Sequence, residues 1–371
     1  DLIFLALASQ HKSLYLLREA VQFGSLQVKG SGFDAPEERF KDIAEEMNFV
    51  DIERVRELLV DKFRRGLGAE AACVEDTALV NDYIFICYLL GNDFLPHFPS
   101  LHIKRGGLDT LLDVYLKCVR DTGSSVVLST SPVTLNLEFL GKLLAALAKL
   151  EDNFFRTLLP RFQERFQRRR CPSSDPCERE LWDLDNLRFP IEDPVKLGSD
   201  EPILWKHRYY EYHFGADRAQ GKFRSYLCKK YLEGLVWVAR YYFDSCPSWT
   251  WHFPYPHAPF LSDLSHYFET QPKDHNSLKF EDSVPLPPLT QLLAVLPPQC
   301  SSELPLNYQP LMGPSSPLAD LYPIIIEIDL EGVDMFWQGV PKLPRLDLER
   351  IRKAVKELPL TKTERIRNLI C

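Results

Sequence analysis

The sequence has 371 residues, with 44 Lys and Arg against 52 Asp and Glu, which gives a formal net charge of −8. Hydrophobic residues make up 45% and charged residues 26%, a globular composition that excludes a disordered tail or a fibre. Proteins that coat duplex nucleic acid through bulk charge are usually basic, so that class is disfavoured, whereas a local basic groove or a carboxylate metal site is not.

Neither membrane attachment nor secretion is predicted. No apolar run reaches the roughly 20 residues of a membrane span, and the apolar start at 1–8 lacks the basic segment of a signal peptide. The nine cysteines are irregularly spaced and contain no Cys-x-x-Cys pair, which predicts neither a zinc site nor a disulfide framework. The sequence therefore favours a reducing intracellular compartment, nucleus or cytoplasm.

The first predicted elements are strands. Residues 1–8 form a continuous apolar run, typical of a strand buried on both faces of a parallel sheet, and we expect a chain that starts inside a strand to belong to a longer protein. A second strand is predicted over 14–21. Helix signals begin at Asp34, and residues 53–63 continue them with an apolar stripe.

The middle of the chain predicts helices over 75–90 and 108–116, with Gly91 as a left-handed C-cap of the first. The longest periodic stretch is 134–168, which Pro160 should kink or interrupt.

The second half alternates helices with irregular segments. Residues 171–204 are predicted to be a loop or flexible insert, and 216–242 a helix. Residues 244–320 are Pro-rich and irregular apart from a helix near 289–296. A strand over 324–330 and a helix over 348–358 complete the prediction.

One candidate for chemistry is the motif Gly91-Asn92-Asp93-Phe94-Leu95-Pro96-His97. A carboxylate at a rigid helix-to-turn junction suits a Mg²⁺ ligand. Asn and Asp are also common in turns after a helix, so on spacing alone capping is the stronger interpretation. Asp1, at the edge of the first apolar run, has the same two readings: a site at a sheet edge or a surface acid.

An aromatic tract spans residues 237–260, with nine aromatic side chains in 24 residues, where the chain average of 12% predicts about three. Its prolines rule out one continuous helix. Exposed aromatics on a rigid loop can stack single-stranded bases at about 1–3 kcal/mol each. The alternative is a small core that fixes the loop. Basic residues of 156–170 and 206–230 likewise either steer a phosphate backbone or form solvated helix faces.

Residues 81–103 (NDYIFICYLLGNDFLPHFPSLHI) resemble the signature of the Xrn/Rat/Pacman family of 5′→3′ exoribonucleases. Further blocks of that family are matched in the correct order, at residues 1–8, 205–214, 241–263, 287–297, 316–323 and 335–344. The resemblance covers nearly the whole chain, and its several ordered blocks make it specific.

The resemblance implies an α/β, helix-rich fold: part of a PIN/flap-endonuclease-like nuclease sheet, a long helical arm and a bracing, irregular C-terminal region. It divides the chain into 1–130 (C-terminal part of the nuclease core), 131–245 (helical region with arm and insert) and 246–371 (aromatic segment and second conserved region).

The family also implies processive two-metal hydrolysis of single-stranded RNA that bears a 5′ monophosphate. Asp1 and Asp93 match family acids that bind two Mg²⁺ or Mn²⁺ ions, and hard oxygen ligands suit these metals. Asn92 and His97 would support Asp93, and Trp249 or Trp251 would hold the RNA. The other acids, the 5′-phosphate pocket and a base-stacking histidine belong to an upstream half of the polypeptide, so we expect these 371 residues alone to be inactive.

Two departures from the family pattern stand out. His257 occupies a family tyrosine position and Pro256 the usual histidine position, and residues 121–206 align poorly. The competing hypothesis is a non-catalytic RNA-binding or scaffold module that keeps the exonuclease fold. Some blocks resemble the nuclear branch of the family and others the cytoplasmic branch, so the sequence leaves the branch, the protein partners and the source open.

Overall fold

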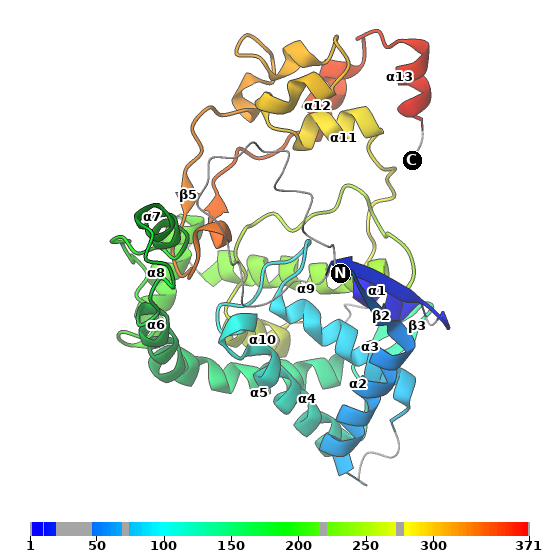
Figure 1. Ribbon diagram of the computed structural model, residues 1–371. Coiled ribbons are helices and arrows are strands. Elements are labelled where there is room, and N and C mark those ends of the chain that lie inside the picture. The colour runs from blue at the N-terminus through cyan, green and yellow to red at the C-terminus, as the bar shows by residue number, and fades with distance from the viewer. Residues whose placement is uncertain are drawn as a thin grey trace. The chain divides into compact units, whose positions relative to one another are not determined.

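The computed structural model describes residues 2–9, 11–19, 47–68, 74–215, 221–271 and 278–369 (Figure 1). Helices dominate these residues, which confirms the helix-rich prediction, and the described strands form three separate two-stranded antiparallel sheets. A PIN-like nuclease sheet therefore remains a prediction. None of the helices in the described ranges is long and apolar enough to span a membrane, and the described cysteines are free thiols.

The α-helices are α1 (Leu2–Ala8), α2 (Ile52–Leu67), α3 (Asp76–Cys87), α4 (Gly107–Thr122), α5 (Leu137–Asn153), α6 (Leu159–Gln167), α7 (Pro176–Asp185), α8 (Pro202–Phe214), α9 (Gly221–Phe243), α10 (Leu261–Thr270), α11 (Pro288–Val295), α12 (Leu348–Val355) and α13 (Lys362–Arg367). A π-helical segment, Phe154–Leu158, joins α5 to α6. The strands are β1 (Tyr15–Glu19), β2 (Met47–Asp51), β3 (Val127–Thr130), β4 (Val133–Leu135), β5 (Ile328–Asp329) and β6 (Val340–Pro341).

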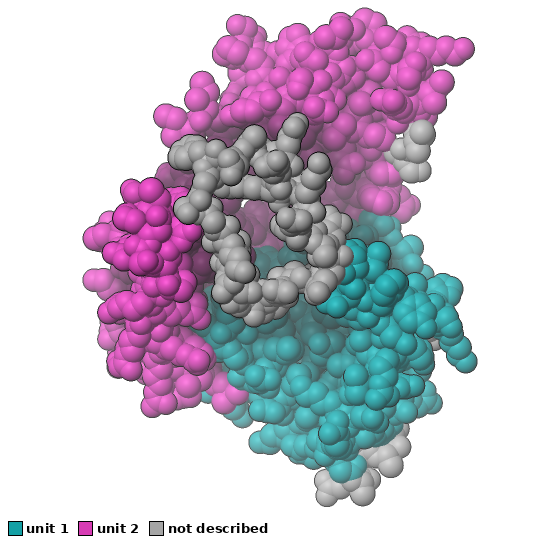
Figure 2. Space-filling model, in the orientation of Figure 1, with its two compact units in different colours: residues 1–149, 228–246, 258–278 teal, residues 150–227, 247–257, 279–371 magenta. Residues whose placement is uncertain are grey.

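The chain divides into two compact units (Figure 2). Unit 1 comprises residues 1–149, 228–246 and 258–278, and unit 2 comprises residues 150–227, 247–257 and 279–371. Each unit thus collects three separate stretches of sequence, and α9 contributes its first turns to unit 2 and the remainder to unit 1. Every site described below lies within one unit.

Unit 1 is built around α3, in which seven of the twelve residues are buried, all of them from Leu79 onward. Phe63 of α2 packs edge-on against Tyr115 of α4 at 5.8 Å between ring centroids. The carboxylate of Asp82, fully buried on α3, accepts hydrogen bonds from the hydroxyl of Tyr115 (2.8 Å) and from the backbone N–H groups of Val126 and Val127 (2.9 and 2.8 Å). Asp82 therefore ties the start of the β3–β4 hairpin to the helical core.

Unit 2 contains a C-terminal core between α11, α12 and the irregular segment that connects them. Its buried members are Leu289, Leu293, Leu304, Tyr308, Leu311, Met312, Leu318 and Ile351. Within the same unit, β5 pairs with β6 so closely that a Cβ on Gly339 would lie 2.5 Å from Ile328 Cγ2. Glycine at 339 is what allows β6 to approach β5.

The predicted strand over residues 1–8 is wrong: residues 2–8 form the helix α1. Ala6 and Leu7 are buried, and Arg56 Nη2 donates a hydrogen bond to the Leu7 carbonyl at 3.1 Å. A short apolar run has no periodicity that separates a buried strand from a buried helix. Here α1 packs against α2 and α3, and none of the described strands pairs with it.

Other predicted elements are confirmed with adjusted ends. The helices predicted over 53–63, 75–90, 108–116, 289–296 and 348–358 correspond to α2, α3 with a following 3₁₀ turn, α4, α11 and α12, and the strand over 14–21 contains β1. The helix predicted over 216–242 corresponds to α9, although 216–220 lie outside the described residues. The helix signals at Asp34 also lie outside them.

Three predictions need correction. The segment 171–204, predicted to be a loop, contains the helix α7. Its N-cap Asp175 accepts hydrogen bonds from the N–H groups of Cys177 and Glu178, but the prolines of the segment led to the prediction of a loop. The irregular region 244–320 also contains α10, which buries Leu261, Leu264 and Phe268 at helical spacing. The strand predicted over 324–330 is present only as the two residues of β5, Ile328–Asp329.

Candidate functional site

The turn that follows α3 places Asp93. A 3₁₀ turn, Tyr88–Leu90, ends at Gly91, whose φ of 88° is left-handed, as predicted, although its ψ of 148° is not that of an αL cap. A Cβ at residue 91 would lie 2.9 Å from the backbone N and 3.1 Å from the Cβ of His97. Gly91 is therefore required both by its φ and by the close return of the chain at His97.

The side chain and backbone of Asn92 form the hydrogen bonds that stabilise this turn. Its Oδ1 accepts hydrogen bonds from the N–H groups of Phe94 and Leu95, each at 2.9 Å, and its own N–H donates to the Leu95 carbonyl at 2.9 Å. The capping reading is thus correct for Asn92. Asp93 follows Asn92 and is exposed to solvent. The hydrogen bonds of Asn92 fix the backbone that carries it.

The rest of the motif anchors this turn to α9. The ring of Phe94 lies 4.9 Å from the rings of both Trp237 and Tyr241, and the hydroxyl of Tyr231 donates to the Pro96 carbonyl at 2.8 Å. His97 Nδ1 lies 2.9 Å from the Phe98 carbonyl. Asp93 is therefore the one member of the sequence Asn92–Phe98 that combines a charged side chain with solvent exposure.

Three buried polar atoms in and beside this turn have no hydrogen-bond partner among the described residues. They are Tyr88 Oη, Asn92 Nδ2 and Tyr242 Oη. The rings of Tyr88 and Tyr242 are 5.1 Å apart. Burial, with a smaller contribution from the negative charge of Asp93, raises the pKa of Tyr242 to about 12. The phenol of Tyr242 therefore stays protonated at neutral pH.

Asp1 lies outside the described residues, so its predicted pairing with Asp93 stays a prediction. Phe4 of α1 packs edge-on against Tyr242 at 6.5 Å between ring centroids, and the negative charge of Asp93 contributes to the raised pKa of Tyr242. Within unit 1, Tyr242 thus contacts α1 through Phe4 and lies close enough to Asp93 to be affected by its charge. One exposed carboxylate supplies a hard oxygen ligand of the kind that Mg²⁺ prefers, but a tight site needs further ligands.

The aromatic loop, defined as residues 247–257, belongs to unit 2 and is held by polar contacts. Ser283 Oγ accepts hydrogen bonds from the N–H groups of Trp249 (2.7 Å) and Thr250 (3.2 Å) and lies 3.2 Å from the buried Ser248 Oγ. The Trp249 side chain is 54% exposed, whereas Trp251 is half-buried with its ring 6.1 Å from that of Phe280. Of the two predicted residues, Trp249 presents the freer face for stacking.

Several of the predicted basic residues lie in local ion pairs on helix surfaces. Arg156 pairs with Asp152 at 2.8 Å and Arg208 with Asp200 at 2.9 Å, both within unit 2. Lys230 pairs with Glu233 at 2.7 Å in unit 1. These contacts favour the reading of solvated helix faces over that of a phosphate-binding groove for these residues.

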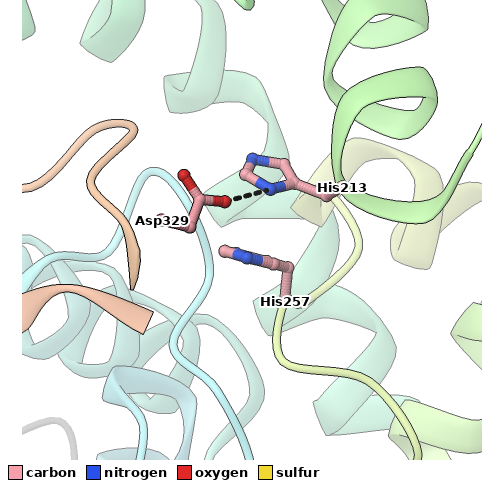
Figure 3. Close-up of side chains that lie close together, drawn as sticks. All are labelled: His213, His257 and Asp329. Carbon is pink, nitrogen blue, oxygen red and sulfur yellow. Dashed lines mark ion pairs between the residues drawn. The ribbon is translucent and has the colours of Figure 1, made fainter. Parts of the chain in front are cut away.

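A cluster that the sequence did not reveal brings together His213, His257 and Asp329 in unit 2 (Figure 3). His213 lies in the last turn of α8, His257 ends the aromatic loop, and Asp329 lies on β5. One ligand atom from each side chain lies within 4.8 Å of the other two. We refer to these residues as the His213 cluster. They are 44 and 72 positions apart, so no short motif signals them.

His213 and the two carboxylates beside it are nearly hidden from water. The side chains of His213, Asp329 and Glu331 are 1%, 8% and 8% exposed. Burial opposes charge on His213, yet Asp329 and Glu331 outweigh it and raise the pKa of His213. Burial also disfavours the charged form of Asp329. The hydrogen bonds from His213, the Glu331 N–H and Tyr212, together with the charge of His213, have the larger effect and lower the pKa of Asp329 to about 2.

Comparison with known proteins identifies the family. Residues 74–180 and 176–370 match the sequence model of the Xrn1 helical domain. A 5′-3′ exoribonuclease 2 homolog of Drosophila melanogaster is 32% identical over 322 residues, covering 74% of this chain and 34% of that protein. The 5′-3′ exoribonuclease 2 of Gallus gallus is 31% identical over 353 residues, covering 78% of this chain and 36% of that protein.

The 5′-3′ exoribonuclease 1 of Homo sapiens is 29% identical over 404 residues, which cover 99% of this chain and 23% of the human protein. The chain thus spans 34% and 36% of the two exoribonuclease 2 relatives and less of the human one. With the helical-domain match over most of its length, the chain belongs to the Xrn family, and the three relatives above are named 5′-3′ exoribonucleases.

Proposed function

We propose that the chain is the helical-domain part of a 5′→3′ exoribonuclease that degrades single-stranded RNA bearing a 5′ monophosphate. The observation that carries the proposal is the rigid turn after α3, which displays Asp93 in a family whose relatives carry this name. A turn is formed without an exposed acid at this position, whereas a metal-dependent nuclease needs carboxylates to hold its ions.

The donors around Asp93 fit a hard divalent ion. The Asp93 carboxylate would hold Mg²⁺ or Mn²⁺ together with Asp1 and acids supplied by the rest of the polypeptide. When bound, two such ions activate a water and stabilise the leaving oxygen of a phosphodiester. The chain itself fixes the Asp93 backbone through Asn92, and the protonated Tyr242 phenol can donate a hydrogen bond to an oxygen beside it.

RNA would meet this chain at the aromatic loop. Trp249 offers an exposed ring on a backbone that Ser283 holds in place, and a fixed ring stacks a base without losing much conformational freedom. Because bases of every kind have a stacking face, such a contact holds RNA without selecting its sequence. That property suits an enzyme that moves along a strand.

The experiment compares the full-length polypeptide that carries these residues with its Asp93→Asn variant on 5′-monophosphate RNA in Mg²⁺. We expect the variant to degrade RNA at least about 10- to 100-fold more slowly, because losing even an outer partner of a metal ligand costs about that much. Asp113→Asn is the matched control, since Asp113 is also an exposed acid of unit 1, on α4. RNA with a 5′ hydroxyl tests the end requirement.

Equal rates for the parent and the Asp93→Asn variant would reject the assignment of Asp93. If the parent binds RNA but releases no nucleotides from either substrate, the scaffold hypothesis replaces the enzyme. The 371 residues expressed alone are expected to be inactive, because the resemblance assigns only Asp1 and Asp93 of the metal ligands to them.

A further inference from the structure

His213 is held in one orientation by Glu331. Its Nε2 atom lies 3.2 Å from Glu331 Oε2, at hydrogen-bond distance. With a proton on Nε2 donated to this carboxylate, the lone pair of the neutral imidazole is on Nδ1. An outer carboxylate that fixes the tautomer in this way is the usual companion of a histidine that binds a metal.

The opposite nitrogen of His213 faces a second carboxylate across a gap. Nδ1 is buried, has no hydrogen bond to any residue that the structure describes, and lies 3.6 Å from Asp329 Oδ2. The other oxygen, Oδ1, is occupied, because it accepts hydrogen bonds from the Tyr212 hydroxyl (3.1 Å) and the Glu331 N–H (3.0 Å). Oδ2 is therefore the atom directed at His213.

Two acceptor atoms that face each other out of contact with water repel unless a cation lies between them. A proton on Nδ1 would draw the pair to about 2.7–2.9 Å, the length of a charge-assisted hydrogen bond. A zinc-class ion at about 2.0–2.1 Å from each atom would hold them roughly 3.4 Å apart in a tetrahedral site. The observed 3.6 Å is closer to the second value.

We propose that a divalent transition-metal ion of the Zn²⁺ class binds between His213 Nδ1, His257 and Asp329 Oδ2, with Glu331 as the outer carboxylate that holds His213. Two imidazoles and one carboxylate suit Zn²⁺ far better than Mg²⁺, and a water would complete four-coordination. Cysteine spacing predicted no zinc site, and histidines 44 positions apart carry no spacing signal of their own.

The ring of His257 must turn for this ion to bind. Its centroid lies 3.7 Å from that of His213, and the two ring planes differ by only 31°. A metal lies close to the plane of each imidazole that binds it, so we expect binding to open this stack. His257 ends the aromatic loop, so the ion would connect α8, that loop and β5. It would brace the segment that carries Trp249.

The test is titration of metal-free protein with Zn²⁺ by calorimetry, in millimolar Mg²⁺ so that the carboxylate site proposed at Asp93 is saturated. Co²⁺, added in place of Zn²⁺, gives visible absorption that reports nitrogen ligation and low coordination number. We expect one Zn²⁺ per chain, bound equally well by the Asp93→Asn variant, which separates this proposal from the proposed nuclease site.

His257→Tyr is the informative variant, because it installs the residue of the family pattern and should fold, as circular dichroism would verify. We expect it to weaken Zn²⁺ binding by at least about tenfold, and Glu331→Gln to weaken it about 10- to 100-fold. His252→Ala is the matched control, an exposed histidine of the same loop outside the cluster. Unchanged affinity in His257→Tyr, or no Zn²⁺ bound by the parent, would overturn the proposal and leave a protonated His213 ion pair.

Discussion

The ring of Phe94 lies 4.9 Å from the ring of Trp237, and this contact ties the residue that follows Asp93 to the long helix α9. On the other side of Asp93, the side chain of Asn92 binds the backbone of the same turn. The position of the exposed Asp93 carboxylate is thus fixed by the contacts of Asn92 and Phe94, the residues on either side of it. Its position depends on residues that would not touch a substrate.

Replacing Asn92 with Ala should therefore impair Asp93 without altering any carboxylate. The change removes the acceptor for the N–H groups of Phe94 and Leu95, which should cost about 1–2 kcal/mol of stability and lower the rate of RNA degradation. Asn92→Asp keeps an acceptor oxygen at that position and should retain more activity than Asn92→Ala. Urea unfolding and degradation of 5′-monophosphate RNA measure the two effects, and equal activity in Asn92→Ala and the parent would contradict the positioning role.

Gly91→Ala should be more damaging than a typical surface substitution. A side chain at φ 88° is strained, and its Cβ would clash with the backbone N of His97 at 2.9 Å. We expect a loss of roughly 2–4 kcal/mol in unfolding free energy. Gly68→Ala is the control, because Gly68 also has a positive φ, 66°, but no atom lies within 4 Å of its added Cβ. Similar losses in both variants would mean that φ strain alone, and not the return of the chain at His97, decides the cost.

Trp249 and Trp251 should separate RNA binding from stability. Trp249→Ala removes an exposed ring, so we expect weaker binding of single-stranded RNA by about 1–3 kcal/mol and little change in unfolding. Trp251→Ala removes the contact with Phe280 and should lower stability more than Trp249→Ala does. Fluorescence anisotropy with labelled RNA and thermal unfolding distinguish the two. The assignment fails if RNA affinity falls only in Trp251→Ala.

The sequence predicted elements best where one periodic pattern covered several turns. The stretch 134–168 buries Leu140, Leu143, Leu144 and Leu147 on one face, as its spacing indicated. The interruption near Pro160 is present as the π-helical segment Phe154–Leu158, which ends two residues before that proline. Such patterns succeed because burial of one helix face is a local property of the sequence.

Prediction failed where the outcome depended on distant partners. Residues 2–8 form a helix because α2 and α3 receive their apolar side chains, and nothing within those seven residues specifies that neighbour. The same limit hid the His213 cluster, since His213, His257 and Asp329 meet only through the fold of unit 2. Asp93 was identified through family resemblance, whereas its spacing alone favoured a turn, and the turn is indeed present at Asn92.

Asp82 should give the protein a measurable pH dependence of stability. Its carboxylate is fully buried on α3, and burial raises its pKa to about 7, although Val127, Val126 and Tyr115 donate hydrogen bonds that act in the opposite direction. The folded state thus holds a proton on Asp82 more tightly than the unfolded state does, where the pKa is near 3.8. Stability from this group is complete below about pH 4 and is lost as the pH rises through about 7.

The Asp82→Asn variant isolates this effect, because the amide does not titrate. We expect the stability of the parent relative to Asp82→Asn, from urea unfolding, to fall by up to about 4 kcal/mol between pH 4 and pH 8. Asp113→Asn, on an exposed face of α4, should show no such trend. A constant difference between the parent and Asp82→Asn across this range would mean that the three donors keep Asp82 ionised in the folded state. The hydrogen bonds to the β3–β4 hairpin would then outweigh the cost of burying the charge.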